Sequence, residues 1–187
     1  AEVKNNQLYI SVIIDKKKMK KMKSGTSILS EDVIVNVTSP KLVKASCVGS
    51  GEFIATTDIK SENVKFDISG TGEIKLKTVT ADNMTLNIAG AGDIDLQQAN
   101  VKDINVSIAG AGDINIANVD SGCQKTVLSV AGAGEISASF TDCEELKCSI
   151  AGAGEIELNG KAANYSESIA GAGKIKKDGL KITGKNK

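Results

Sequence analysis

The sequence of 187 residues contains no histidine, no arginine and no tryptophan, and aromatic residues make up only 3% of it. Histidine has the side chain whose ordinary pKa lies nearest neutrality, and arginine provides the planar fork that binds phosphate and carboxylate groups. Their absence excludes the Ser-His-Asp triad and the most familiar zinc sites. An enzyme would have to rely on Asp, Glu, Lys or Tyr, so the composition favours a protein that is not an enzyme.

The chain also lacks an excess of charge and any long hydrophobic run. Its 23 basic residues, all lysines, balance 23 acidic ones, so no overall field attracts nucleic acid or an anionic membrane. No run of 18 apolar residues occurs, and a membrane-spanning helix is therefore not expected. Hydrophobic residues still reach 41%, and they are mostly Ile, Val, Leu and Ala, which stack well in layers.

A seven-residue motif with two glycines dominates the rest of the sequence and occurs seven times. The copies are CVGSGEF (47–53), ISGTGEI (68–74), IAGAGDI (88–94), IAGAGDI (108–114), VAGAGEI (130–136), IAGAGEI (150–156) and IAGAGKI (169–175). The first glycines of successive copies are 21, 20, 20, 22, 20 and 19 residues apart. A period near 20 is typical of leucine-rich repeats, β-solenoids or tandem hairpins.

Within one repeat, apolar residues alternate with polar ones. In KDINVSIAGAGDINIANV (102–119) they have period two, which predicts strands with one buried face. The leucine-rich pattern is missing, and tandem hairpins would need a tight turn within each unit. We therefore predict an all-β fold, a parallel β-helix with about 20 residues per coil and seven motif-bearing coils. Gly110 and Gly112 should face inward at a corner, with Ala111 pointing outward.

The repeat predicts a single domain over residues 1–187 with atypical ends. Residues 1–46 contain strand-like runs at 8–14 and 32–40, separated by a Lys-rich loop with six lysines within 16–23. The coils span residues 47–175, and residues 176–187 form a C-terminal cap or tail. Glu167 occupies a column that is apolar in other coils, so either the register shifts there or the last coil opens to water.

Four cysteines occupy apolar columns of the repeat. Cys47 aligns with Ile108, and Cys148 aligns with Val106. Cys123 and Cys143 share one column in consecutive coils, so a bridge between them is open to test. Parallel side chains in a regular ladder make that bridge awkward, and we expect all four cysteines to act as small core residues.

An acidic residue follows the glycines in every copy but the last. This column contains Glu52, Glu73, Asp93, Asp113, Glu135 and Glu155, and Lys174 ends it. Stacked carboxylates about 5 Å apart repel each other, so they must face solvent or bind cations. We expect no metal or other cofactor, and the acids should face solvent. The alternative is a ladder of Ca²⁺ ions, and its candidate ligands are Glu73, Asp93, Asp113, Glu135 and Glu155.

Repeated [IV]-[AS]-G-[AST]-G-[DE]-[IF] coils, preceded by a Val-rich strand and the Pro40-Lys41-Leu42 step, resemble a known bacterial family, the auto-transporter adhesins with a head GIN domain. The resemblance covers residues 33–178. It implies a right-handed parallel β-helix in an exported or surface-associated protein, and it brings no catalytic or binding residues. Lys174 and the Lys-rich segment at 16–23 depart from the family pattern.

These observations predict a non-enzymatic module of the cell envelope, cell surface or extracellular space, an adhesin or surface scaffold with distributed contacts. Its partner would be a protein or a glycan, and nucleic acid is not expected. One alternative is a polysaccharide-processing β-helix enzyme that uses a carboxylate pair. A Ca²⁺-binding surface module is another.

Overall fold

The computed structural model describes residues 2–4, 7–10 and 34–184. The chain divides into two compact units, Ala1–Thr38 and Ser39–Lys187, so the prediction of one domain over 1–187 stays a prediction. Among the described residues all regular structure is β. No helix in this part of the chain has the length and hydrophobicity needed to cross a bilayer.

The first unit contains one antiparallel pair of short strands, β1 (Glu2–Lys4) and β2 (Gln7–Tyr9). The strand predicted at 8–14 is therefore present at residues 8–9 but does not include Ile10, and residues 11–14 lie outside the described residues, as does the predicted Lys-rich loop. The strand predicted at 32–40 is wrong over its described part, because residues 34–43 form no strand. The alternation of valines does not lead to burial there, since Val35 and Val37 are both exposed.

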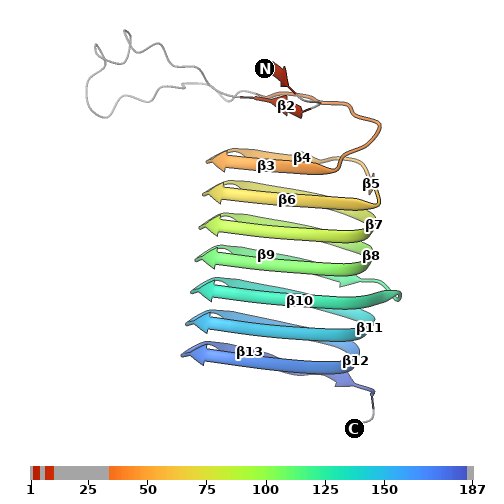
Figure 1. The fold of residues 1–187 in the computed structure, drawn as a ribbon, viewed down its shortest axis with the longest axis vertical. Helices are drawn as coiled ribbons and strands as arrows, with labels where there is room; N and C mark the ends of the chain where they lie inside the picture. The colour runs from red at the N-terminus through yellow and green to blue at the C-terminus, as the bar shows by residue number, and fades with distance from the viewer. Residues whose placement is uncertain (1, 5–6, 11–33, 185–187) are drawn as a thin grey trace, which may run out of the picture. The chain divides into compact units, whose positions relative to one another are not determined.

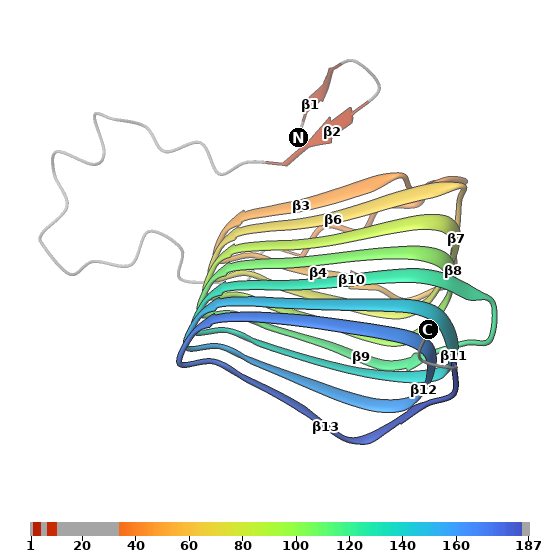
Figure 2. The same cartoon turned by 60° about the horizontal axis from the view of Figure 1, so that its bottom comes forward.

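The second unit is a stack of coils in which strands of successive coils pair in parallel (Figures 1 and 2). Its strands are β3 (Lys44–Gly49), β4 (Glu52–Ala55), β5 (Ile59–Lys60), β6 (Asn63–Gly70), β7 (Glu73–Gly90), β8 (Asp93–Gly110), β9 (Asp113–Val119), β10 (Cys123–Gly132), β11 (Glu135–Gly152), β12 (Glu155–Gly171) and β13 (Lys174–Ile182). This arrangement confirms the predicted β-solenoid with a repeat near 20 residues.

Each complete coil has two strand segments. In β7 and β8 they form one strand of 18 residues that bends around a corner, and the glycine motif then turns the chain into the next coil. The first segment of β8 pairs with β9, and its second segment pairs with β10. Two sheet faces therefore enclose the core, and each coil contributes one layer to both.

The core consists of vertical columns of aliphatic side chains. Ile74, Ile94, Ile114, Ile136 and Ile156 occupy one such column, and all five are buried. Burial of each side chain removes it from water and stabilises the coil by roughly 1.5–3 kcal/mol. Cys123, Cys143 and Cys148 are buried free thiols and Cys47 is half-buried, so the reading as core residues is confirmed fully for three of the four.

The glycine corner brings two backbones together more closely than any side chain allows. Gly110 has φ of +141°, and a Cβ placed on it would lie 2.1 Å from the carbonyl oxygen of Gly90. The same oxygen accepts a hydrogen bond of 2.9 Å from the N–H of Ala111. Gly112 lacks the positive φ, but its Cβ would lie 2.2 Å from the oxygen of Gly92. Both glycines are therefore required by the approach of the preceding coil.

We expect Gly110→Ala to lower the free energy of unfolding by about 3 kcal/mol or more, since the methyl group meets backbone at a φ that L-residues avoid. Urea denaturation followed by circular dichroism measures this. Ala111→Ser, a change on the exposed side of the same turn, is the control and should alter stability by less than about 0.5 kcal/mol. Equal losses in both variants would contradict the proposed role of the corner.

The C-terminal coil ends the stack with an open inner face. Cys148 pairs with Glu167, so the register is kept, and Glu167 and Ile169 are both exposed. The second explanation for Glu167, an opening to water, is therefore the correct one. Tyr165 donates a hydrogen bond to Glu167, which also pairs with Lys177 at 2.8 Å. These polar contacts cover an edge that further aliphatic side chains would leave prone to aggregation.

Candidate functional site

The acids that follow the glycine corners form a continuous column on one face, which we call the acid face. Each member is the Cα partner of the next, from Glu52 through Glu73, Asp93, Asp113, Glu135 and Glu155 to Lys174. Their side chains are exposed or half-buried. The fold thus places all five candidate ion ligands in one column, as predicted from the period of the repeat.

Lysines neutralise both ends of the acid column. Lys75 lies 2.9 Å from Glu52 and 2.9 Å from Glu73, and hydrogen bonds to these two carboxylates raise the pKa of Lys75. At the other end Lys176 pairs with Glu155. These lysines reduce the repulsion between stacked carboxylates where they contact them.

The centre of the column lacks such partners. Asp93 and Asp113 form no ion pair with the residues that the structure describes. Burial, and then the negative charge of Asp113, raise the pKa of Asp93. Asp113 accepts a hydrogen bond of 3.2 Å from the N–H of Glu135. The central coils therefore carry uncompensated negative charge in the middle of the acid face.

One group of acids in the described chain is compact enough to hold an ion. Carboxylate oxygens of Glu135, Glu155 and Glu157 lie within 4.8 Å of one another. Glu157 was not among the ligands predicted from the sequence, since it lies two residues beyond the column. Lys176 already pairs with Glu155 in this cluster. The ladder of ions along the whole column stays a prediction.

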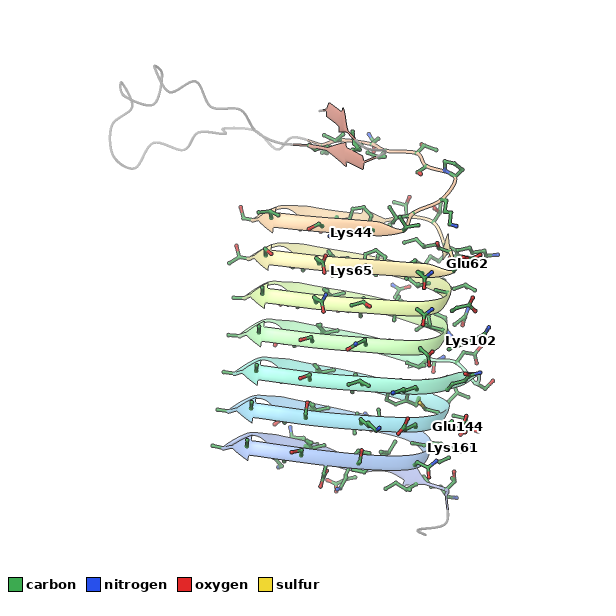
Figure 3. All side chains as sticks on the ribbon, viewed as in Figure 1. Lys44, Glu62, Lys65, Lys102, Glu144 and Lys161 are labelled. Atoms are coloured by element: carbon green, nitrogen blue, oxygen red, sulfur yellow. The ribbon has the colours of Figure 1, made fainter. Side chains whose placement is uncertain are left out.

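The opposite sheet face, which we call the polar face, carries ladders of hydrogen-bonded side chains. Asn87 donates to Asp67 at 2.9 Å, and Ser149 donates to Ser129 at 3.1 Å. Burial works to raise the pKa of Asp67, but hydrogen bonds from Asn87 and Lys44 and the charges of Lys44 and Lys65 outweigh it and lower the pKa. Lys44 and Lys65 extend from neighbouring coils on this face (Figure 3).

Charges of both signs line the second corner of the coils, the bend between the two strand segments of each coil. Glu62, Lys102, Glu144 and Lys161 project along this side of the stack (Figure 3), and Lys102 pairs with Asp82 at 2.7 Å. A shallow groove of about 500 Å³ crosses the same corner and is lined by residues of several coils, including Lys60, Asp82, Asn100 and Asp120.

The comparison with protein families matches residues 1–125 and 120–184 to the family described as "Putative auto-transporter adhesin, head GIN domain". The chain belongs to this family. The resemblance seen in the repeated glycine coils is thereby confirmed. No curated protein and no solved structure matches the chain.

Membership of the head GIN family assigns no residue a chemical role, so the central acids are best tested through stability. We expect Asp93→Asn to raise the free energy of unfolding at pH 7 by up to about 0.5 kcal/mol, because it removes repulsion that solvent partly screens. Urea denaturation at low and high salt measures the gain, which should shrink as salt increases.

The stability gained by Asp93→Asn should become smaller as the pH falls. A raised pKa means that folded Asp93 binds a proton before the unfolded chain does, so the wild type becomes more stable as pH falls toward the ordinary Asp pKa of about 3.9. Asp103→Asn is the control, since Asp103 is the Cα partner of Lys125 on the polar face. A gain of the same size in Asp103→Asn would show that Asp93 experiences no more repulsion in the acid column than an acid outside it.

Addition of EDTA or of millimolar Ca²⁺ should leave the melting temperature unchanged within about 1 °C, because Lys176 already pairs with Glu155 in the one compact group of acids among the described residues. Differential scanning fluorimetry with Mg²⁺ as a matched ionic-strength control measures this. A rise in melting temperature with Ca²⁺ alone, absent in Glu135→Gln, would instead establish the ion site.

Proposed function

We propose that the chain is a non-enzymatic β-helix module that is exported to the cell envelope, the cell surface or the extracellular space. There it acts as an adhesin or surface scaffold through contacts distributed over many coils. Membership of a family named for adhesins supports this proposal. The partner would be a protein or a glycan on an opposing surface.

One structural observation carries the proposal: the same exposed or half-buried polar positions recur in register, coil after coil, on two faces. The acid column and the Ser129–Ser149 ladder are examples. Neighbouring strands place such positions about 4.8 Å apart. A surface of this kind offers many equivalent weak contacts, and such contacts reach useful strength by acting together.

The distribution of acids argues against the polysaccharide-processing alternative. Glycoside hydrolysis needs two carboxyl groups in distinct environments, an acid that keeps its proton and a carboxylate that is ionised. In the acid column a carboxylate recurs at the same position in almost every coil instead of one isolated pair, and the sequence has no arginine or histidine beside them. We therefore propose that the chain catalyses no reaction.

Coil deletion tests the proposal because the repeat allows coils to be removed cleanly. Deletion of residues 73–92, 93–112 or 135–154 removes 20 residues each time and joins a motif glycine to the acid that normally follows one. Each variant, displayed on beads, should still adhere to glycan and matrix-protein arrays. Its adherence should be about two- to threefold weaker than that of the wild-type chain. Circular dichroism verifies that each shortened solenoid folds.

A local site would behave differently. If one deletion abolished adherence while the other two left it intact, contacts would be concentrated in one coil and the distributed-contact proposal would be wrong. Release of reducing sugar from a polysaccharide panel by the wild-type chain would contradict the non-enzymatic part. The three deletions serve as controls for one another, since they change length equally.

A further inference from the structure

The core contains one pair of cysteines in direct contact. Cys123 begins β10 and Cys143 lies in β11, and the two are Cα partners in consecutive coils. Their sulfur atoms lie 2.8 Å apart, closer than the van der Waals contact of two sulfurs. The side chains are buried, with exposed fractions of 4% and 1%. Neighbouring strands are spaced about 4.8 Å apart, which lies inside the Cα separation that a disulfide requires.

A buried hydroxyl accompanies the two thiols. Thr126 is fully buried and is the one polar core residue in the described part of the chain. Its Oγ1 lies 3.1 Å from Cys123 Sγ and 3.6 Å from Cys143 Sγ. The column that holds Thr126 contains Ile104 and Leu146 in the adjacent coils. The side chains of Cys123, Cys143 and Thr126 thus converge at one point of the core. The column of Thr126 is otherwise apolar in the adjacent coils.

These contacts favour one thiolate in the pair. The hydrogen bond from Cys123 lowers the pKa of Cys143 against the opposing effect of burial, and Thr126 and the backbone of Glu145 also lower it. The hydrogen bond with Cys143 and burial raise the pKa of Cys123. A thiolate is the attacking species in thiol–disulfide exchange, and a neighbouring thiol is the group that completes it.

The chain is irregular next to this pair, although Cys123 and Cys143 keep the register of β10 with β11. A turn at Asp120–Gly122 interrupts the chain directly before Cys123, where this coil carries two extra residues. Register also shifts between Phe140 and Cys143 in the pairing of β11 with β12. In a regular parallel ladder the side chains of Cα partners point the same way, which opposes the disulfide dihedral. At this pair the two sulfur atoms nevertheless lie in direct contact, and Gly122, which precedes Cys123, is exposed.

From these contacts we infer that Cys123 and Cys143 are a cross-link site, where a disulfide forms between consecutive coils when the protein meets an oxidising disulfide. The Cys143 thiolate attacks one sulfur of the oxidant RSSR and expels RS⁻. Cys123 then loses its proton to solvent and attacks Cys143 sulfur, expelling the second RS⁻. The protein loses two electrons, the oxidant gains them, and two RSH result. The inference does not depend on the proposed adhesin function.

The other two cysteines provide internal controls. Cys148 is buried between Leu128 and Glu167, and Cys47 pairs with Ile68. Neither has a cysteine as a partner among the described residues. They should remain thiols under conditions that oxidise the pair.

Lysine-specific digestion tests the cross-link directly, because each cysteine lies in its own peptide: 45–60, 103–125, 126–147 and 148–161. The folded wild-type chain is incubated with oxidised glutathione, alkylated in denaturant and digested. We expect the free thiol count to fall from four to two and peptide 103–125 to be joined to 126–147. Dithiothreitol should restore all four thiols.

Variants separate this reaction from general oxidation. Cys143→Ser should lose the cross-linked peptide, whereas Cys148→Ala should keep it. The oxidised wild type should melt roughly 6–12 °C higher than the reduced form, because the link closes a loop of about 20 residues in the unfolded chain. Four thiols after exposure to oxidant would overturn the inference. So would peptides joined through Cys47 or Cys148 with equal yield, or a link that forms only in denaturant.

Discussion

The whole solenoid depends on one close approach of backbone to backbone at the glycine corners. The carbonyl oxygen of Gly90 accepts the N–H of Ala111 while it occupies the space where a Cβ of Gly110 would lie. The next coil repeats this contact between Gly110 and Ala133. The hydrogen-bonded ladder therefore continues around the corner from one sheet face to the other, and successive coils keep strand spacing on both faces.

This spacing explains the aliphatic, aromatic-poor composition. When coils are stacked at a fixed distance, each core position sees copies of itself above and below, so side chains of similar size fill the columns best. The chain departs from the regular pattern after Phe140, where the register of β11 with β12 shifts. The coil after it has Gly160 as its Cα partner, where a Cβ would lie only 1.8 Å from the Phe140 carbonyl oxygen. Here the close approach of two backbones, and not the size of the Phe140 side chain, requires glycine in the following coil.

The same regularity distributes chemistry over the surface. A carboxylate at one exposed position becomes a column of carboxylates, and lysines are placed where the column begins and ends, at Lys75 and Lys176. The pair Cys123–Cys143 is the opposite case. Its contact with Thr126 arises where the repeat is broken by two extra residues, and it is local for that reason. Repetition produces extended surfaces in this fold, and departures from repetition produce individual sites.

The sequence by itself determined the fold class, the coil length, the glycine corners and the register of the acid column, because a strict period constrains every coil at once. It also placed Cys123 beside Cys143 correctly. It did not determine residues 34–40, whose alternation predicts a strand although none forms there. The cluster of Glu135, Glu155 and Glu157 likewise depends on side-chain directions across coils.

Only the tertiary structure decided how Glu167 is accommodated and what surrounds the cysteine pair. The period assigns Glu167 to an inward column, but burial depends on whether another layer covers it, and Tyr165 and Lys177 contact it instead. Thr126 gives no signal in the sequence beyond a threonine in an aliphatic column. Its role follows from distances of a few ångströms between side chains of different coils, which a one-dimensional pattern does not contain.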